Sequence, residues 1–487
     1  MSDRRFKIDF NWDEDRPQGT AFEATSGKAV LRLGSSVIWG KPSNDSCNGI
    51  HWTWVDLLAF LAENWVALLN EPVPSAFSAD FDRAPHLLRR KIEQRWALEL
   101  RAGVLSEAQH LKKEEELFYF EERHDLSRGI PGKTVPDLFV LRESNGSGFI
   151  VSSSVGPTES LTADEVIVCL ENAGNEICSR LEHLNDPVAV TRCAEWRARW
   201  PALDLSWVCL STGASADYLS EIADDSDPAQ FWGEGNSAFT DSLVMALARM
   251  GVGARLSPYS VKEILRLANS NRTPLGKKLD VLRNEVASWQ QANFQEPEPA
   301  DQGRLLAGWF RKRQNLTNAK QVVDPRRLIE ALEVKIIESN LSEAGVDAIS
   351  CWRPSEQPTV ILNMNSVRNR RVSGVRAALA HELCHLIVDN DRKVPFAEVV
   401  RGDSHEGIEK RARGFAAELL MPRAEIVRSF EKSKPMALFL DELSRCFDVS
   451  HEIIVWQIRR SELFEGLSEE NIETLRRFVT NPQDLDG

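Results

Sequence analysis

The sequence predicts a multidomain α+β protein, and three features indicate this fold class. The chain has 487 residues, about three times the length of a typical domain. Short strand-like apolar runs and longer segments of helical period alternate along it. Residues 296–299 read Glu-Pro-Glu-Pro, an acidic and extended linker. We therefore expect an α+β domain over 1–210, a helical region and linker over 211–299, a mostly helical domain with a small β-sheet over 300–465, and a tail over 466–487.

The amino-terminal elements follow from apolar periodicity and turn residues. Thr162 and Glu165 form a capping box that begins a long helix, and Gly and Ser residues at 144–148 predict a hairpin turn. The expected elements are a strand over 29–39, helices over 52–70 and 86–104, β-structure over 115–155, a helix over 162–184, and mostly helix over 215–293.

The carboxyl-terminal elements are marked by caps and prolines. Asp324 caps a helix whose first residue is Pro325, and a later helix must stop before Pro422 because the residue before proline avoids the helical region. The expected elements are helices over 324–332, 373–388, 404–420, 437–446 and 451–463, and strands over 334–337 and 359–363.

Composition excludes several classes of protein. The net charge is −14, whereas a dedicated nucleic-acid binder is usually basic. The eight cysteines form no CxxC pair, so a secreted disulfide framework or a zinc ribbon is not expected. The first residues lack the apolar core of a signal peptide, and the most apolar stretch contains Asp56 and Glu63. We therefore expect a cytoplasmic protein with reduced thiols.

The strongest functional signal is the sequence His381-Glu382-Leu383-Cys384-His385. On a helix, His381 and His385 lie one turn apart on one face, so both imidazoles can reach one zinc ion. Glu382 projects beside that ion, where a base for the attacking water must lie. The alternative is a surface helix with two solvated histidines.

A catalytic zinc site needs a third protein ligand. Glu409 is the best candidate, because it lies near the start of the next helix on the same face as the small residues Ala412 and Ala416. Glu418, Asp403 and His405 are weaker candidates for this ligand.

These residues carry a resemblance to a known family. The motif around the two histidines, followed by Glu409-x-x-Ala412-x-x-Phe415-Ala416-x-x-Leu419-Leu420-Met421-Pro422, resembles the ImmA/IrrE-type metallo-endopeptidases over about residues 303–465. The resemblance implies a gluzincin-like fold, one Zn²⁺ held by His381, His385 and Glu409, and Glu382 as general base. It also implies limited cleavage of a partner helix-turn-helix repressor.

The chain departs from the family pattern at two positions near the site. Cys384 stands where glycine is usual, and it either packs in the core or provides a fourth ligand. Ala377 replaces a usual aromatic residue. In addition, no tyrosine follows Tyr259, so an oxyanion stabiliser other than zinc has to be His405, His451 or an arginine such as Arg376.

Two other regions carry weaker functional signals. The helices on either side of Val449 and Ser450 could form a DNA-binding helix-turn-helix with Arg459 and Arg460 on its second helix, although packing on the peptidase core is favoured. The segment around Asp137 vaguely resembles a PD-(D/E)xK nuclease core, but its second strand reads Ile-Val-Ser-Ser-Ser and lacks the acidic residue and lysine. An inactive recognition module or an ordinary α+β domain is expected there.

The amino-terminal tryptophans could line a ligand surface, but they are expected to fill cores. The function expected from the sequence is a zinc endopeptidase that makes a regulatory cut in a helix-turn-helix repressor, in stress response, phage defence or mobile-element control. The alternatives are a non-catalytic toxin–antitoxin or repressor partner with a structural zinc site, and a DNA-binding regulator.

Overall fold

The computed structural model divides the chain into two compact units, Met1–Val252 and Gly253–Gly487. Each unit combines helices with small sheets, so the prediction of a multidomain α+β protein is confirmed. The finer division into four parts stays a prediction. The structure describes residues 5–14, 19–41, 49–73, 88–142, 148–200, 204–223, 231–232, 243–253, 255–270, 273–274, 276–293, 298–316, 322–352, 356–388, 396–399, 406–430 and 434–479.

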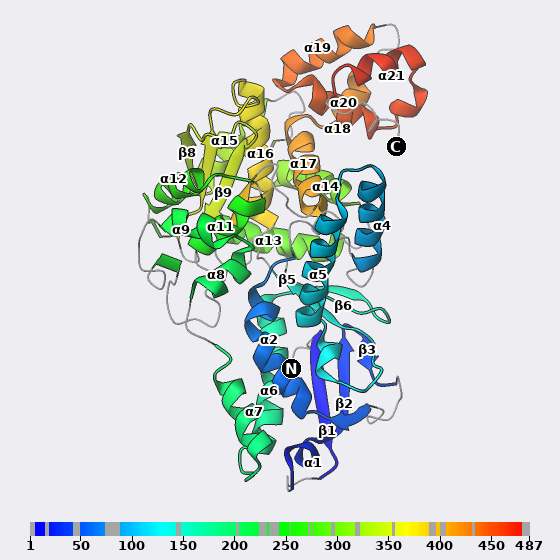
Figure 1. Cartoon of the computed structure of the whole chain (residues 1–487). Coiled ribbons are helices and arrows are strands. Elements are labelled where there is room, and N and C mark those ends of the chain that lie inside the picture. The colour runs from blue at the N-terminus through cyan, green and yellow to red at the C-terminus, as the bar shows by residue number, and fades with distance from the viewer. Residues whose placement is uncertain are drawn as a thin grey trace. The chain divides into compact units, whose positions relative to one another are not determined.

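The first unit contains two antiparallel sheets (Figure 1). In the first sheet, β2 pairs with β1 along one edge and with β3 and β4 along the other. In the second sheet, β6 lies between β5 and β7. The strands are β1 (Phe6–Trp12), β2 (Ser26–Leu33), β3 (Ser36–Trp39), β4 (Ile50–Thr53), β5 (Phe139–Arg142), β6 (Phe149–Ser152) and β7 (Thr158–Leu161).

Helix α2 is central to the core of this unit, because it contacts α6, α7 and α5 (Figure 1). Six tryptophans are almost completely buried in the first unit, which supports a packing role for them: Trp39, Trp54, Trp65, Trp96, Trp196 and Trp232. The helices are α1 (Ala21–Ala24), α2 (Val55–Asn70), α4 (Leu88–Arg101), α5 (Glu107–His124), η2 (Leu126–Gly129), α6 (Ala163–Leu181), α7 (Pro187–Arg197), α8 (Leu205–Thr212), α9 (Ala216–Ala223) and α11 (Leu243–Gly253).

The expected hairpin between β5 and β6 and the capping box of Thr162 are confirmed. Two expectations were wrong. The strand expected over 29–39 is the two strands β2 and β3, because the chain turns at Gly34, whose φ is +57°. The β-structure expected from residue 115 is in fact the second half of α5 at its start. The many charged residues of this helix obscured the helical spacing of its buried residues Leu117, Phe120 and His124.

The region with a weak nuclease resemblance has no acidic residue or lysine on β6. Asp137 Oδ1 accepts a hydrogen bond from the main-chain N of Ser154 at 3.0 Å. Asp137 thus ties the chain before β5 to the end of β6, which is a structural role.

The second unit is built on a mixed sheet in the order β11-β9-β10-β8 (Figure 1). Strand β10 is parallel to β8, and the other pairs are antiparallel. The strands are β8 (Lys335–Ser339), β9 (Ala348–Trp352), β10 (Thr359–Asn363) and β11 (Phe396–Val399). The sequence indicated β8 and β10 but not β9 or β11.

Helix α16 lies on this sheet against β9 and β10, and α13, α15 and α17 pack around it. The helices are α12 (Pro258–Asn269), α13 (Lys277–Asn293), α14 (Pro299–Arg313), α15 (Pro325–Ala331), α16 (Val372–Val388), α17 (Glu406–Leu420), α18 (Arg423–Ser429), α19 (Met436–Phe447), α20 (His451–Arg459), η3 (Phe464–Gly466) and α21 (Glu469–Arg476). None of the helices in the described part of the chain is long and apolar enough to cross a membrane.

Candidate metal centre

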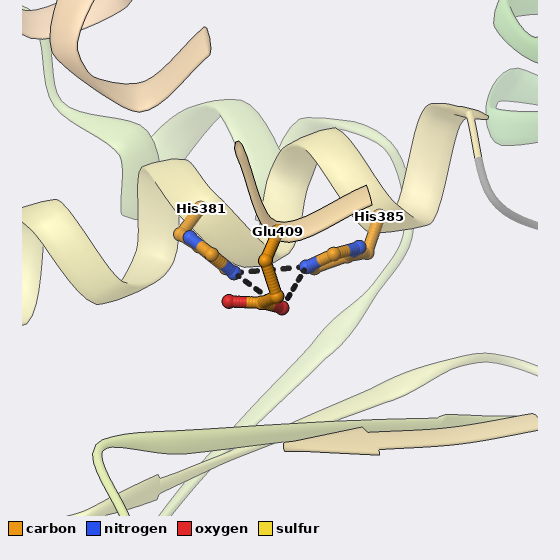
Figure 2. A group of neighbouring side chains, drawn as sticks. All are labelled: His381, His385 and Glu409. Carbon is orange, nitrogen blue, oxygen red and sulfur yellow. Dashed lines mark hydrogen bonds and ion pairs between the residues drawn. The ribbon is translucent and has the colours of Figure 1, made fainter. Parts of the chain in front are cut away.

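Helix α16 places both histidines of the HExxH sequence in the interior. His381 is 4% exposed and His385 is completely buried. The neighbouring Leu379, Leu383 and Leu386 fill the core, so the helix cannot rotate without exposing them. The two Nε2 atoms lie 2.8 Å apart and point toward the same place (Figure 2).

Helix α17 brings Glu409 to the histidines. Its Oε1 lies 3.5 Å from Nε2 of His381 and 3.6 Å from Nε2 of His385 (Figure 2). Its Oε2 lies 3.3 Å from Nη2 of Arg413, one turn further along α17. Ala412 and Ala416 are buried on α17, which allows the close approach of the two helices that the sequence predicted.

The three side chains fit a metal ion. One ligand atom from each of His381, His385 and Glu409 lies within 4.8 Å of the other two, and no other such group occurs among the described residues. Glu409 Oε1 is buried and has no hydrogen-bond partner in the described part of the chain. Two imidazole nitrogens and one carboxylate oxygen are the donor set of a catalytic zinc site.

The electrostatics of Glu409 agree with this assignment. Burial by itself would raise the pKa of the carboxyl, but the charges of the adjacent His381 and His385 imidazoles outweigh burial and lower the pKa. The carboxyl is thus favoured in its ionised form, which is the form that binds a metal ion.

Glu382 lies next to this group but is not part of it. Its side chain is completely buried, and Oε2 accepts a hydrogen bond from the hydroxyl of Ser350 on β9. Oε1 has no hydrogen-bond partner among the described residues. Burial raises the pKa of the Glu382 carboxyl, against the opposing effects of His385, His381 and Ser350.

Glu418, one of the other candidates for the third ligand, does not join the group. Glu418 accepts from the main-chain N of Arg423 at 3.1 Å and from Nε2 of Gln457 at 2.9 Å. Cys384, the candidate for a fourth ligand, is completely buried and packs in the core of this unit. Asp403 and His405 lie outside the described residues.

Two of the candidates for an oxyanion donor, Arg376 and His451, have other partners. Arg376 donates to the carbonyl oxygens of Phe447 at 2.9 Å and Val323 at 2.8 Å, and also to that of Asp448. His451 bonds Oδ1 of Asp441 through Nε2 at 2.8 Å. Arg376 therefore clamps α16 to the chain before α15 and to the turn after α19.

Three contributors to the site were not found from the sequence. Ser350 contacts Glu382 across the sheet. Arg283 on α13 donates Nε to the carbonyl of Leu386 at 2.8 Å, and Arg311 on α14 donates Nη1 to the carbonyl of Leu419 at 2.6 Å. These arginines bind the last turns of the two helices that carry the ligands, and the sequence contains no local signal for such distant contacts.

Comparison with protein families matches residues 329–458 to a peptidase family described as the IrrE N-terminal-like domain. This segment of the second unit is therefore similar to that peptidase family. The matched segment includes α16, the helix α17 that carries Glu409, and the following helices α18, α19 and α20. The match confirms the resemblance to the ImmA/IrrE-type peptidases for this segment. No curated protein matches the chain.

The matched domain also contains the helix pair considered as a DNA-binding element. Asp448 at the turn between α19 and α20 adopts a left-handed conformation, and Ser450 caps α20. The guanidinium of Arg459 lies over the ring of Phe464, 4.6 Å from its centroid. Both helices contribute buried residues to the core of the unit, as the packing alternative requires.

Proposed function

We propose that this protein is a zinc-dependent endopeptidase that makes a limited, regulatory cut in a partner protein. The observation that carries this proposal is the convergence of His381, His385 and Glu409 on one point beside the buried carboxyl of Glu382. The match of this segment to a peptidase family supports hydrolysis of a protein chain.

When bound by these three ligands, zinc would supply a Lewis acid that polarises the scissile carbonyl and makes water more acidic. Glu382 performs the proton transfers. It accepts a proton from the attacking water and delivers that proton to the leaving amine. Its raised pKa suits both steps, because a carboxyl with a raised pKa holds an accepted proton more readily and can then donate it.

The partner we propose is a helix-turn-helix transcriptional repressor in the cytoplasm, cut in stress response, phage defence or mobile-element control. The family resemblance supports this partner, and the net charge of −14 favours a protein over a nucleic acid. The buried position of the ligands is consistent with narrow specificity, because a chain segment must fit closely to reach them.

The test uses the full chain loaded with zinc and a small helix-turn-helix protein encoded by the adjacent reading frame. We expect one defined cut that EDTA abolishes and added Zn²⁺ restores. Glu382→Gln should bind zinc with unchanged stoichiometry and fail to cut. A Glu382→Gln protein that cuts as well as the wild type would refute the mechanism.

A second candidate function is a non-catalytic toxin–antitoxin or repressor partner with a structural zinc site. The nearly complete burial of His385 and Glu409 favours it, since structural zinc sites are closed to solvent. Metal removal distinguishes the two, because loss of a structural zinc unfolds the domain, whereas loss of a catalytic zinc abolishes cleavage by a folded protein.

A further inference from the structure

The sheet beneath α16 presents an apolar surface to this helix, with one exception. Side chains on a strand alternate between its two faces. On the face of β9 and β10 toward α16, the core contains Ala348, Val360 and Leu362. Ser350 lies on the same face of β9, two residues after Ala348. Ser350 is polar, whereas Ala348, Val360 and Leu362 are apolar.

Ser350 is completely buried, so its hydroxyl needs a hydrogen-bond partner. That partner is Oε2 of Glu382. A serine hydroxyl donates one hydrogen, and a carboxylate has two oxygens. The bond therefore fixes one oxygen of Glu382 and leaves Oε1, which has no partner among the described residues, available for a proton.

The strand that carries Ser350 is well suited to hold a side chain in place. β9 pairs with β10 on one edge and with β11 on the other, so both of its edges are bonded to neighbouring strands. Ser350 stands opposite Val360 in this register. A group on a central strand is positioned more accurately than one on a loop.

We propose that Ser350 is a positioning residue for catalysis, which holds Oε2 of Glu382 so that Oε1 takes the proton of the attacking water. This inference rests on the proposed peptidase function. Loss of the hydroxyl lets the carboxylate rotate away from the attacking water, and positioning of this kind affects turnover more than binding of the substrate.

The experiment compares Ser350→Ala, Ser350→Thr and a matched control, Ser366→Ala. Ser366 is also completely buried in this unit, and its hydroxyl also donates to a carboxylate, that of Asp347. Each full-length protein is loaded with zinc and assayed on the small helix-turn-helix protein used to test the proposed function. Each is also loaded with Co²⁺, whose visible absorption bands report the geometry of its ligands.

We expect Ser350→Ala to lower kcat about 10-fold with unchanged KM and zinc content, which is less than the about 100- to 10,000-fold that general acid–base catalysis contributes, because Glu382 itself remains. Its Co²⁺ bands should change, because an untethered carboxylate can turn toward the ion. Ser350→Thr keeps the hydroxyl and should restore both properties. Ser366→Ala should lower the melting temperature while kcat and the Co²⁺ bands remain those of the wild type.

A Ser350→Ala protein with wild-type kcat and wild-type Co²⁺ bands overturns the positioning role. So does a Ser366→Ala protein that loses kcat equally, since the effect would then be one of general packing. If the wild type does not cut the helix-turn-helix protein but the Co²⁺ bands respond to Ser350→Ala alone, Ser350 does position Glu382, and the result counts against the proposed cleavage instead.

Discussion

Arg283 donates its Nε to the carbonyl oxygen of Leu386 at 2.8 Å, and Leu386 directly follows the second histidine of the candidate metal centre. Arg283 lies on α13, before the segment that matches the IrrE N-terminal-like domain. Its side chain is 6% exposed. The helix that carries both histidines is thus held at its end by a residue from outside the matched segment.

Replacement of this arginine should destabilise the second unit. Arg283→Met keeps most of the aliphatic stem but leaves the buried carbonyl of Leu386 without its donor. We expect a loss of about 1–3 kcal/mol in the free energy of unfolding, measured by urea denaturation. Arg313→Met is the control, because Arg313 is half exposed and solvent screens its ion pair with Glu285. Equal losses of unfolding free energy in the two variants would show that the hydrogen bond to Leu386 stabilises the unit no more than the exposed ion pair does.

Gly303 on α14 sets the distance between α14 and α17. A Cβ at Gly303 would lie 1.9 Å from the carbonyl oxygen of Arg411, so Gly303→Ala must push α17 away. Because Glu409 is on α17, we expect weaker zinc binding together with a lower melting temperature. Competition with a chromophoric chelator measures the affinity.

Gly308→Ala on the same helix is the matched control for Gly303→Ala. A Cβ at Gly308 has no heavy atom within 4 Å. We expect this variant to stabilise α14 by about 0.5–1 kcal/mol, because alanine is the better helix former, and to bind zinc normally. Normal zinc binding by Gly303→Ala would contradict the proposed link between α14 and the metal centre.

The sequence was sufficient for the parts of the site that have local signals. The spacing of His381 and His385 and the apolar residues between them predicted a helix with both imidazoles on one face, and Ala412 and Ala416 predicted a close approach near Glu409. Each of these inferences depends on residues within a few turns of one helix.

The remaining parts depend on contacts that are distant in the sequence. Arg283 and Leu386 are 103 residues apart, and Arg311 and Leu419 are 108 residues apart. β11 is four residues long and is stabilised by pairing with β9, so its own sequence carries little signal. Ser350 could be recognised as functional only after β9 was placed beneath α16.

Glu409 should be the carboxylate that determines zinc affinity. We expect Glu409→Gln to weaken zinc binding by more than the about 10–100-fold that loss of an outer-shell partner costs, because it removes a negative ligand from a buried cation. Isothermal titration with Zn²⁺ measures the change. Glu418→Gln alters a half-buried carboxyl on the same helix and should leave the affinity unchanged. The reverse result would make Glu418 the third ligand.

Glu71 should make the stability of the first unit depend on acid pH. Burial would raise the pKa of its carboxyl, but hydrogen bonds from the buried His124 at 3.2 Å and from Arg123 outweigh burial and lower the pKa. A carboxyl with a lowered pKa in the folded state contributes stability above its ordinary pKa of about 4.3, and this contribution is lost as the pH falls below that value.

Glu71→Gln should therefore have a lower free energy of unfolding than the wild type at pH 7. The difference between the two proteins should shrink between pH 5 and pH 3, because the ordinary pKa of a glutamate, about 4.3, lies in this range. Urea denaturation followed by tryptophan fluorescence measures it. Glu63→Gln, at an exposed position of α2, should match the wild type throughout. A deficit of Glu71→Gln that is the same at every pH would mean that the amide packs badly, and that the ion pair with Arg123 and His124 does not contribute.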